Sequence, residues 1–183
     1  MSKIRPQEFI LPNKKKICIR TAHAKDGAAL VKLMKVIIEE GPFTLQEADE
    51  YKATAKSEAK RISVYRKEEG KIYLVAEIGK EITGFISFNN WDTRRTAHTG
   101  LFSIFIKKKW RGYGIGKLLV QAMLDWAQEN KLIRKISLFV FSTNKNAIRL
   151  YKKLGFRQEG RCPRDMIING KYVDSIMMYK FTK

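Results

Sequence analysis

Apolar residues recur along the chain with two different periods, and these periods predict alternating helices and strands. Alternating or continuous apolar runs predict strands at 17–20, 72–76, 82–88, 98–106 and 136–141. Apolar residues three and four positions apart predict helices at 26–38, 44–65, 118–130 and 144–154. The strand at 98–106 is apolar on both faces, so we place it at the centre of a sheet.

Capping signals predict where two of these helices begin. Asp26 precedes the first apolar stripe and is expected to cap that helix. Thr44 followed by Glu47 has the pattern of a capping box, which predicts that the second helix begins there, with a candidate break near Ser57.

Two turn signals predict hairpins. The turn at 79–81 separates two predicted strands, and Asn169-Gly170 separates extended segments at 157–168 and 172–181. A two-residue Asn-Gly connection is a strong signal for tight pairing of antiparallel strands. We therefore expect hairpins at both places.

The first sixteen residues differ from the rest of the chain. They contain Pro6, Pro12 and the run Lys14-Lys15-Lys16, with too little apolar periodicity for an element. We interpret 1–16 as a basic arm, laid on the surface or loose, and 17–183 as a single domain.

The charge balance narrows the choice of partners. The 183 residues include 37 basic and 18 acidic side chains, a net charge of +19. Such an excess favours phosphorylated cofactors, nucleic acid, or an acidic partner such as the ribosome, although solubility alone could account for part of it.

Targeting and metal signals are absent from the sequence. Residues 1–8 lack the apolar core of a secretory signal, and no apolar run is long enough to span a bilayer, so we expect a cytoplasmic protein without a membrane partner. Cys18 and Cys162 lie far apart, with only His23 and His98 to join them, so neither a metal site nor a disulfide is expected.

The stretch 107–116, Lys-Lys-Lys-Trp-Arg-Gly-Tyr-Gly-Ile-Gly, carries the first chemical signal. A strand pattern enters it and a helix pattern leaves it, so its glycines could bring backbone N–H groups and the positive end of a helix dipole close to an anion. The alternative is a tight turn without a ligand. The three lysines and Lys117 are either solvated or in contact with phosphates.

A second motif follows at 144–156, and together the two stretches resemble the GNAT superfamily of N-acetyltransferases. The second motif is carried by Asn144, Ala147, Tyr151, Gly155 and Phe156, and the order of elements fits the family across 17–181. The resemblance implies an α/β (α+β) fold, with a mixed, mainly antiparallel central sheet flanked by helices. It also implies splayed central strands that admit acetyl-coenzyme A (acetyl-CoA).

The resemblance further implies an enzyme that moves an acetyl group from acetyl-CoA to a primary amine by direct attack in a ternary complex. The acceptor would be a small amine or a protein N-terminus, because Gly160-Arg161 and the stretch at 167–174 look like ribosomal-protein N-terminal and small-amine acetyltransferases. Tyr172 and Asp174 in that stretch either line the acceptor side or complete a hairpin.

The donor-binding residues implied by the resemblance fall in three groups. The main chain near Ile104, Phe105 and Ile106 would pair with the pantetheine arm. The pyrophosphate would meet the glycine loop, made of Arg111, Gly112, Tyr113, Gly114, Ile115 and Gly116, with Lys117 beside it. Asn144 would bond the pantetheine amides, cap its helix, or do both.

Tyr151 occupies the family position for the residue that protonates the departing thiolate; the alternative is core packing. Proton transfer from a phenol of pKa ~10 to a thiol of pKa ~8.5 is uphill by about 2 kcal/mol. A hydrogen bond to the developing thiolate is therefore the safer assignment. No metal is implied.

The general base is the weak point of the resemblance. Many relatives have a glutamate on the strand before the glycine loop, where this chain has Leu101 and no carboxylate within 98–106. His98 is a catalytic candidate because its unperturbed pKa is ~6.5, although a single histidine at the start of a strand is more often structural. Three aspartates are weaker alternatives: Asp92, Asp165 and Asp174.

Two other functions and one assembly state stay open at this point. The chain could be an acyl-CoA-binding regulator without turnover, or a basic module that binds nucleic acid. It could also act as a homodimer.

Overall fold

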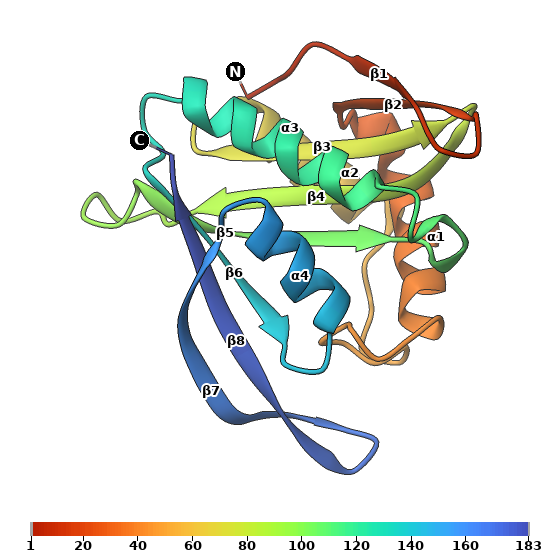
Figure 1. Cartoon of the computed structure of the whole chain (residues 1–183). Coiled ribbons are helices and arrows are strands. Elements are labelled where there is room, and N and C mark those ends of the chain that lie inside the picture. Colours follow the sequence, from red (N-terminus) through yellow and green to blue (C-terminus); the bar gives the residue numbers. More distant parts are fainter. Residues whose placement is uncertain (1, 183) are drawn as a thin grey trace.

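In residues 2–182, the part of the chain that the computed structural model describes, eight strands form one sheet in the order β1-β2-β3-β4-β5-β6-β8-β7 (Figure 1). The strands are β1 (Gln7–Ile10), β2 (Lys16–Thr21), β3 (Lys71–Ile78), β4 (Glu81–Asn90), β5 (Thr99–Ile106), β6 (Lys135–Phe141), β7 (Arg157–Ile168) and β8 (Lys171–Phe181). The β5 and β6 strands are parallel, and the other neighbours are antiparallel. This confirms the predicted mixed, mainly antiparallel sheet.

Helices cover both faces of the sheet (Figure 1). They are α1 (Gly27–Glu39), α2 (Ala55–Lys67), α3 (Ile115–Glu129) and α4 (Lys145–Lys153), with short 3-10 turns η1 (Ala24–Asp26) and η2 (Lys108–Trp110). Alternation along β3 explains the two layers. Ile72 and Leu74 belong to the core that includes α3 and α4, whereas Tyr73 and Val75 belong to the core that includes α1 and α2.

Both predicted hairpins are confirmed, and their turns have the backbone that the sequence requires. Gly79 has a φ of 62° between β3 and β4. Asn169 and Gly170 have φ values of 50° and 74° between β7 and β8, as a two-residue connection of type I′ demands.

The prediction that residues 1–16 contain no element was wrong. Strand β1 pairs with β2 along the edge of the sheet, and Leu11 just after it is buried. Lys15 lies over the ring of Trp110, 5.1 Å from its centroid. The four residues of β1 have no apolar pattern that predicts a strand, and they become one because they pair with the backbone of β2. The division into arm and domain stays a prediction, and its end residues, Met1 and Lys183, lie outside the described residues.

The predicted start of the second helix was also wrong. Helix α2 begins after Thr54, whose Oγ1 accepts from the Ser57 N–H at 3.1 Å, while the Ser57 Oγ accepts from the Thr54 N–H at 2.9 Å. Residues 45–50 are exposed, so a helix there would have no apolar face to bury. The region that includes Thr44 and Glu47 is a loop.

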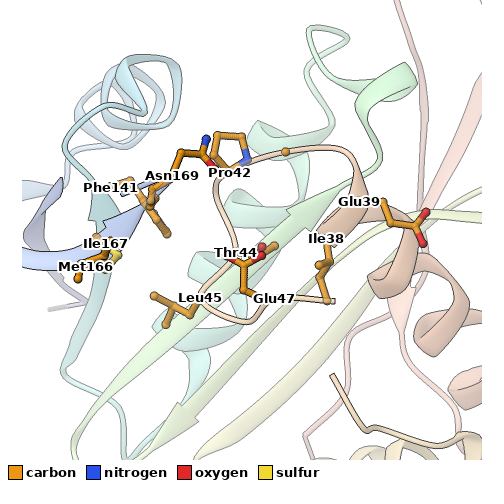
Figure 2. Close-up of a pocket in the computed structure, with 12 residues that line it drawn as sticks. Ile38, Glu39, Pro42, Thr44, Leu45, Glu47, Phe141, Met166, Ile167 and Asn169 are labelled. Atoms are coloured by element: carbon orange, nitrogen blue, oxygen red, sulfur yellow. The ribbon is translucent and has the colours of Figure 1, made fainter. Parts of the chain in front are cut away.

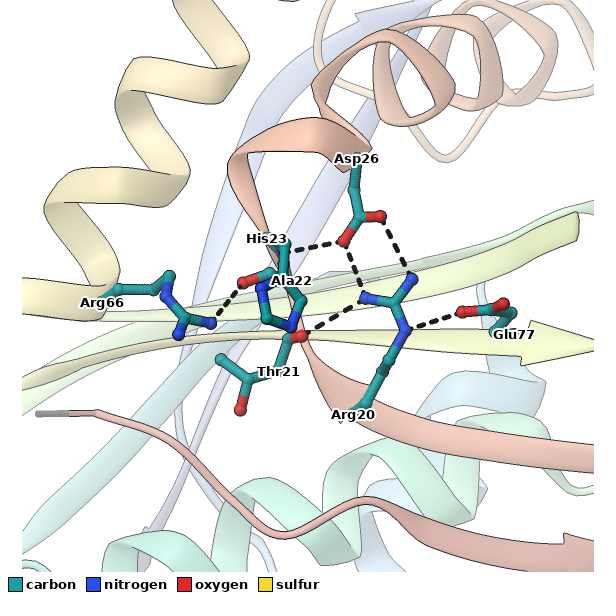
Figure 3. A network of polar contacts seen from close by, with 7 residues as sticks. All are labelled: Arg20, Thr21, Ala22, His23, Asp26, Arg66 and Glu77. Carbon is teal, nitrogen blue, oxygen red and sulfur yellow. Dashed lines mark hydrogen bonds and ion pairs between the residues drawn. The ribbon is translucent and has the colours of Figure 1, made fainter. Parts of the chain in front are cut away.

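Asp26 stands at the start of α1, but its side chain does not cap that helix (Figure 3). The carboxylate accepts from Arg20 Nη1 at 2.7 Å, from Arg20 Nη2 at 3.1 Å and from the His23 N–H at 2.8 Å. Arg20 Nε also donates to Glu77 Oε2 at 2.6 Å. Burial acts to raise the pKa of Asp26, but these hydrogen bonds outweigh it and lower the pKa. The network ties β2 to β3 and to the start of α1.

Within residues 2–182, no helix combines the length and apolarity needed to cross a bilayer.

Candidate functional site

A cleft opens where β5 and β6 separate. The two strands pair at only three positions, from Thr99 with Lys135 to Leu101 with Ser137, although both strands continue beyond them. Beyond this point lie two adjoining cavities, which we call the larger cavity, of about 560 Å³, and the smaller cavity, of about 430 Å³. Strand β5 lines both, and β6 lines the smaller one. This arrangement confirms the predicted splay, and it leaves main-chain groups of β5 without a strand partner on that side.

The glycine loop closes one end of the larger cavity. Gly112 and Gly114 both have a φ of 86°, and a Cβ added to either would meet no atom within 4 Å. Gly116 differs, because an added Cβ would approach Leu150 Cδ2 at 3.2 Å and Ile106 Cδ1 at 3.3 Å. Two of the glycines therefore fit an unusual backbone beside open space, whereas the third fits close packing of neighbouring side chains.

The loop presents the N-terminus of α3 to this cavity. The Leu118 N–H donates to the Gly114 carbonyl at 3.2 Å. The three preceding N–H groups, of Ile115, Gly116 and Lys117, lie in the first turn and have no intrahelical acceptor. Free N–H groups at the positive end of a helix are suited to binding an anion.

Most of the basic side chains around the loop already have partners. Lys107 and Lys109 contact Glu81 at 3.0 and 2.9 Å. Burial acts to raise the pKa of Glu81, but the bonds to the two lysines outweigh burial and lower that pKa. Arg111 Nε donates to the Ile106 carbonyl at 2.8 Å, so that carbonyl is occupied. Lys117 is exposed and lines the larger cavity.

Helix α4 and the residue that caps it supply Tyr151 and Asn144 to both cavities. Asn144 Oδ1 accepts from the Ala147 N–H at 3.1 Å, so the amide oxygen caps the helix and the amide NH₂ is left to donate elsewhere. Tyr151 is 6% exposed and packs edge-on against Phe102 and Phe156. Burial raises the pKa of Tyr151, which keeps the phenol protonated.

The structure does not bring His98 to the cleft. His98 is exposed in the turn before β5, and its carbonyl accepts from the Arg134 and Lys135 N–H groups. It is therefore at the paired end of β5 and β6, away from Tyr151 and the glycine loop. Asp92, another base candidate, is also outside the cleft, 3.5 Å from Lys71.

The smaller cavity contains residues that the family resemblance did not indicate. Phe43 and Leu45 come from the loop after α1, while Asp165 and Ser175 come from the last hairpin. The sequence offered Asp165 only as a weak alternative. Pro163 was the sequence signal that could have drawn attention to this segment, since a proline within a strand marks an edge strand or a bulge. Strand β7 lies at the edge of the sheet and also contains a bulge.

The outer rim of the cleft is a third cavity, of about 330 Å³, between the loop after α1 and the tip of the last hairpin (Figure 2). Thr44 and Leu45 lie on one side, and Met166 and Ile167 lie on the other. Tyr172 is 64% exposed on this hairpin and does not line the cavity. The rim shares Leu45 and Met166 with the smaller cavity, which makes it an entrance to the cleft.

The fold and the cleft define a mixed α/β protein whose glycine-rich helix N-terminus and parted parallel strands line one cleft. The model of the acetyltransferase (GNAT) family matches residues 33–156. The chain belongs to that family.

Relatives agree with this assignment. The chain is 31% identical over 105 residues to the L-amino acid N-acetyltransferase AaaT of Escherichia coli (strain K12), a match that covers 57% of this chain and 65% of that protein. The chain therefore spans less than two thirds of the length of that relative. A GNAT-family acetyltransferase from Streptococcus pneumoniae has a TM-score of 0.88 at 30% identity, over 90% of this chain and 99% of that one. The yncA protein of Salmonella typhimurium, solved with acetyl-CoA, has a TM-score of 0.78 at 22% identity, over 91% and 94%, and shows the shared fold.

Proposed function

We propose that this chain is an acetyl-CoA-dependent N-acetyltransferase that acts on a primary amine, either a small molecule or a protein N-terminus. The observation that carries the proposal is the continuity of the cleft, which runs from the α3 N-terminus, past the unpaired edge of β5, to Tyr151. An anion site joined to an unpaired strand edge fits a ligand with a pyrophosphate and an extended amide chain.

The donor would be held by residues from three elements. The N–H groups of the loop from Gly112 to Lys117 would bind the pyrophosphate, and the open space beside Gly112 and Gly114 fits this approach. Main-chain groups of Ile104 would pair with the pantetheine amides, as would the Asn144 NH₂, whereas the main chain of Phe105 pairs with Phe85 of β4. Arg111 occupies the Ile106 carbonyl, so Ile106 would contribute its N–H and its side chain. Bound acetyl-CoA supplies an activated thioester.

Tyr151 would stabilise the sulphur that leaves when the acceptor amine attacks. Burial raises the pKa of Tyr151, so giving up its proton is even less favourable than for a free phenol. The phenol would therefore donate a hydrogen bond to the developing thiolate and keep its proton. Neither Cys18 nor Cys162 is needed as a nucleophile, because direct attack requires no acyl-enzyme.

The test is turnover with a panel of acceptors. Purified protein is incubated with acetyl-CoA and with separate pools of L-amino acids, polyamines and peptides, and thiol release and acetylated products are measured. Products that depend on both substrates are the expected result. Coenzyme A binding without turnover for any pool would leave the acyl-CoA-binding regulator as the better explanation.

The net charge of +19 supports an acidic partner, such as the ribosome, as a further part of this proposal. Co-sedimentation with ribosomes at low and high salt tests it, because an electrostatic association weakens steeply as salt rises. Sedimentation of the protein alone tests the homodimer.

A further inference from the structure

The smaller cavity of the cleft carries a charge opposite to that of the protein. Asp165 is the only charged side chain among the described residues that line it, and the rest are apolar or neutral, in a chain with a net charge of +19. Tyr151 lines the same cavity. A lone carboxylate in an otherwise uncharged pocket favours a cationic ligand.

A bulge in β7 brings Asp165 to this position. Cys162 faces Ser175 and Met166 faces Val173, so β7 advances by four residues while β8 advances by two. Arg164, inside the bulge, has a φ of 53°, which is unusual for a residue with a side chain. Bulges re-aim side chains beside functional sites, and strain persists where neighbouring contacts enforce it.

Asp174 enforces this conformation and draws nearby positive charge away from Asp165. Asp174 Oδ1 accepts from the Arg164 N–H at 2.8 Å, and its Oδ2 accepts from Arg161 Nε at 2.6 Å. The Arg164 guanidinium lies over the Tyr172 ring, 5.4 Å from the centroid. The two arginines that precede Asp165 in the sequence, Arg161 and Arg164, are therefore directed to other groups.

Ser175 orients the Asp165 carboxylate. Ser175 is 1% exposed, and its hydroxyl donates to Asp165 Oδ2 at 2.5 Å. An incoming ammonium group would then meet Oδ1. Asp165 itself is exposed, so it can exchange protons with water.

We infer that Asp165 receives the acceptor amine and acts as its general base, replacing the carboxylate that β5 lacks at Leu101. This inference rests on the proposed acetyl transfer. The ammonium group gives one proton to Asp165, and the neutral nitrogen attacks the thioester carbonyl. The C–N bond forms and the C–S bond breaks. The amide nitrogen loses its second proton, the thiolate takes up one proton, and Asp165 returns the other to water.

The test compares ethylamine with trifluoroethylamine, which share a two-carbon skeleton but differ greatly in basicity. Trifluoroethylamine is neutral at neutral pH and needs no base before attack. Asp165→Asn should lower kcat/KM for ethylamine by roughly 100-fold, within the range of general-base catalysis, and should affect trifluoroethylamine far less. Asp92→Asn, on an exposed aspartate outside the cleft, is the matched control. Coenzyme A binding should be the same in all three proteins.

Equal losses for the two amines would make Asp165 merely structural, and unchanged kinetics would remove it from the reaction; either result overturns the inference. If the wild type acetylates neither amine, ethylammonium is titrated into enzyme saturated with coenzyme A. Binding that Asp165→Asn abolishes would support the amine site even though the transfer reaction failed. Absence of binding, or binding that survives the substitution, would refute it.

Discussion

The glycine loop offers the sharpest test of the donor site through Gly114→Ala. The φ of 86° at Gly114 costs a residue with a side chain roughly 1–2 kcal/mol. The added methyl group meets no protein atom within 4 Å, so we expect no further loss of stability from steric clash. For a chain of this size, each kcal/mol lowers the melting temperature by about 2–4 °C.

Coenzyme A binding should suffer more than stability. The methyl group would stand where a phosphate approaches the N–H groups of α3, and a lost charge-assisted hydrogen bond is worth about 1.5–3 kcal/mol. That loss raises the Kd by roughly 10- to 100-fold. Calorimetric titration of coenzyme A, below the melting temperature of the variant, measures it.

Gly79→Ala is the matched control for this prediction. Gly79 also has a positive φ, 62°, and open space around an added Cβ, but it lies in the β3–β4 turn and does not line the cleft. It should lose comparable stability and keep its affinity for coenzyme A. If both variants bind coenzyme A equally well, the loop does not hold the pyrophosphate.

Three further substitutions test separate parts of the structure. Tyr151→Phe keeps the ring and should lower kcat by roughly 100-fold at an unchanged KM for acetyl-CoA, in a thiol-release assay; an unchanged kcat would exclude the thiolate role. Asp26→Asn should lower the free energy of unfolding by about 2–3 kcal/mol at neutral pH, because it weakens the charged bonds to Arg20. The pKa of folded Asp26 lies below its ordinary value of 3.8, so its stabilisation is present above pH 3.8 and is lost as pH falls through the folded value. Urea titrations at several pH values should show that the free energy of unfolding falls less at acid pH in the variant than in the wild type. The same pH dependence in both proteins would contradict this role of Asp26. Tyr73→Phe removes the phenol that donates to buried Glu58 at 2.7 Å, and should cost about 1–3 kcal/mol in the same titrations; a smaller loss would mean that water replaces the donor.

The elements that the sequence predicted well are those whose signals are local. Helix α4 has its cap at Asn144 and its stop at Gly155, whose φ is 86°, and the last hairpin has Asn169-Gly170. Strand β1 was missed because it forms only by pairing with β2. The start of the second helix was predicted at Thr44, whereas Thr54 caps it. Capping patterns recur by chance, and burial of an apolar face decides which one starts a helix.

The residues that we propose for the donor could be singled out from the sequence, whereas Asp165 could be named only as one of several alternatives for the base. The glycine loop and Tyr151 lie in two short motifs that a single sequence displays. Asp165 reaches the cleft through a register shift that depends on contacts with Asp174 and Ser175, and no periodicity in the sequence encodes that shift. His98 had a suitable side chain, but the strand direction carries it to the far end of β5.

The brief pairing of β5 with β6 makes the sheet an incomplete ladder. A donor laid along the open edge of β5 would supply the missing strand, so the backbone amides of Ile104 and Ile106, which face away from β4, should exchange with deuterium more slowly in its presence. Ligand at a hundred times its Kd stabilises the folded state by about 2.7 kcal/mol through mass action. The abundance of the folded protein would then follow the supply of that ligand, and a shortage of it would reach the protein first as faster unfolding and degradation.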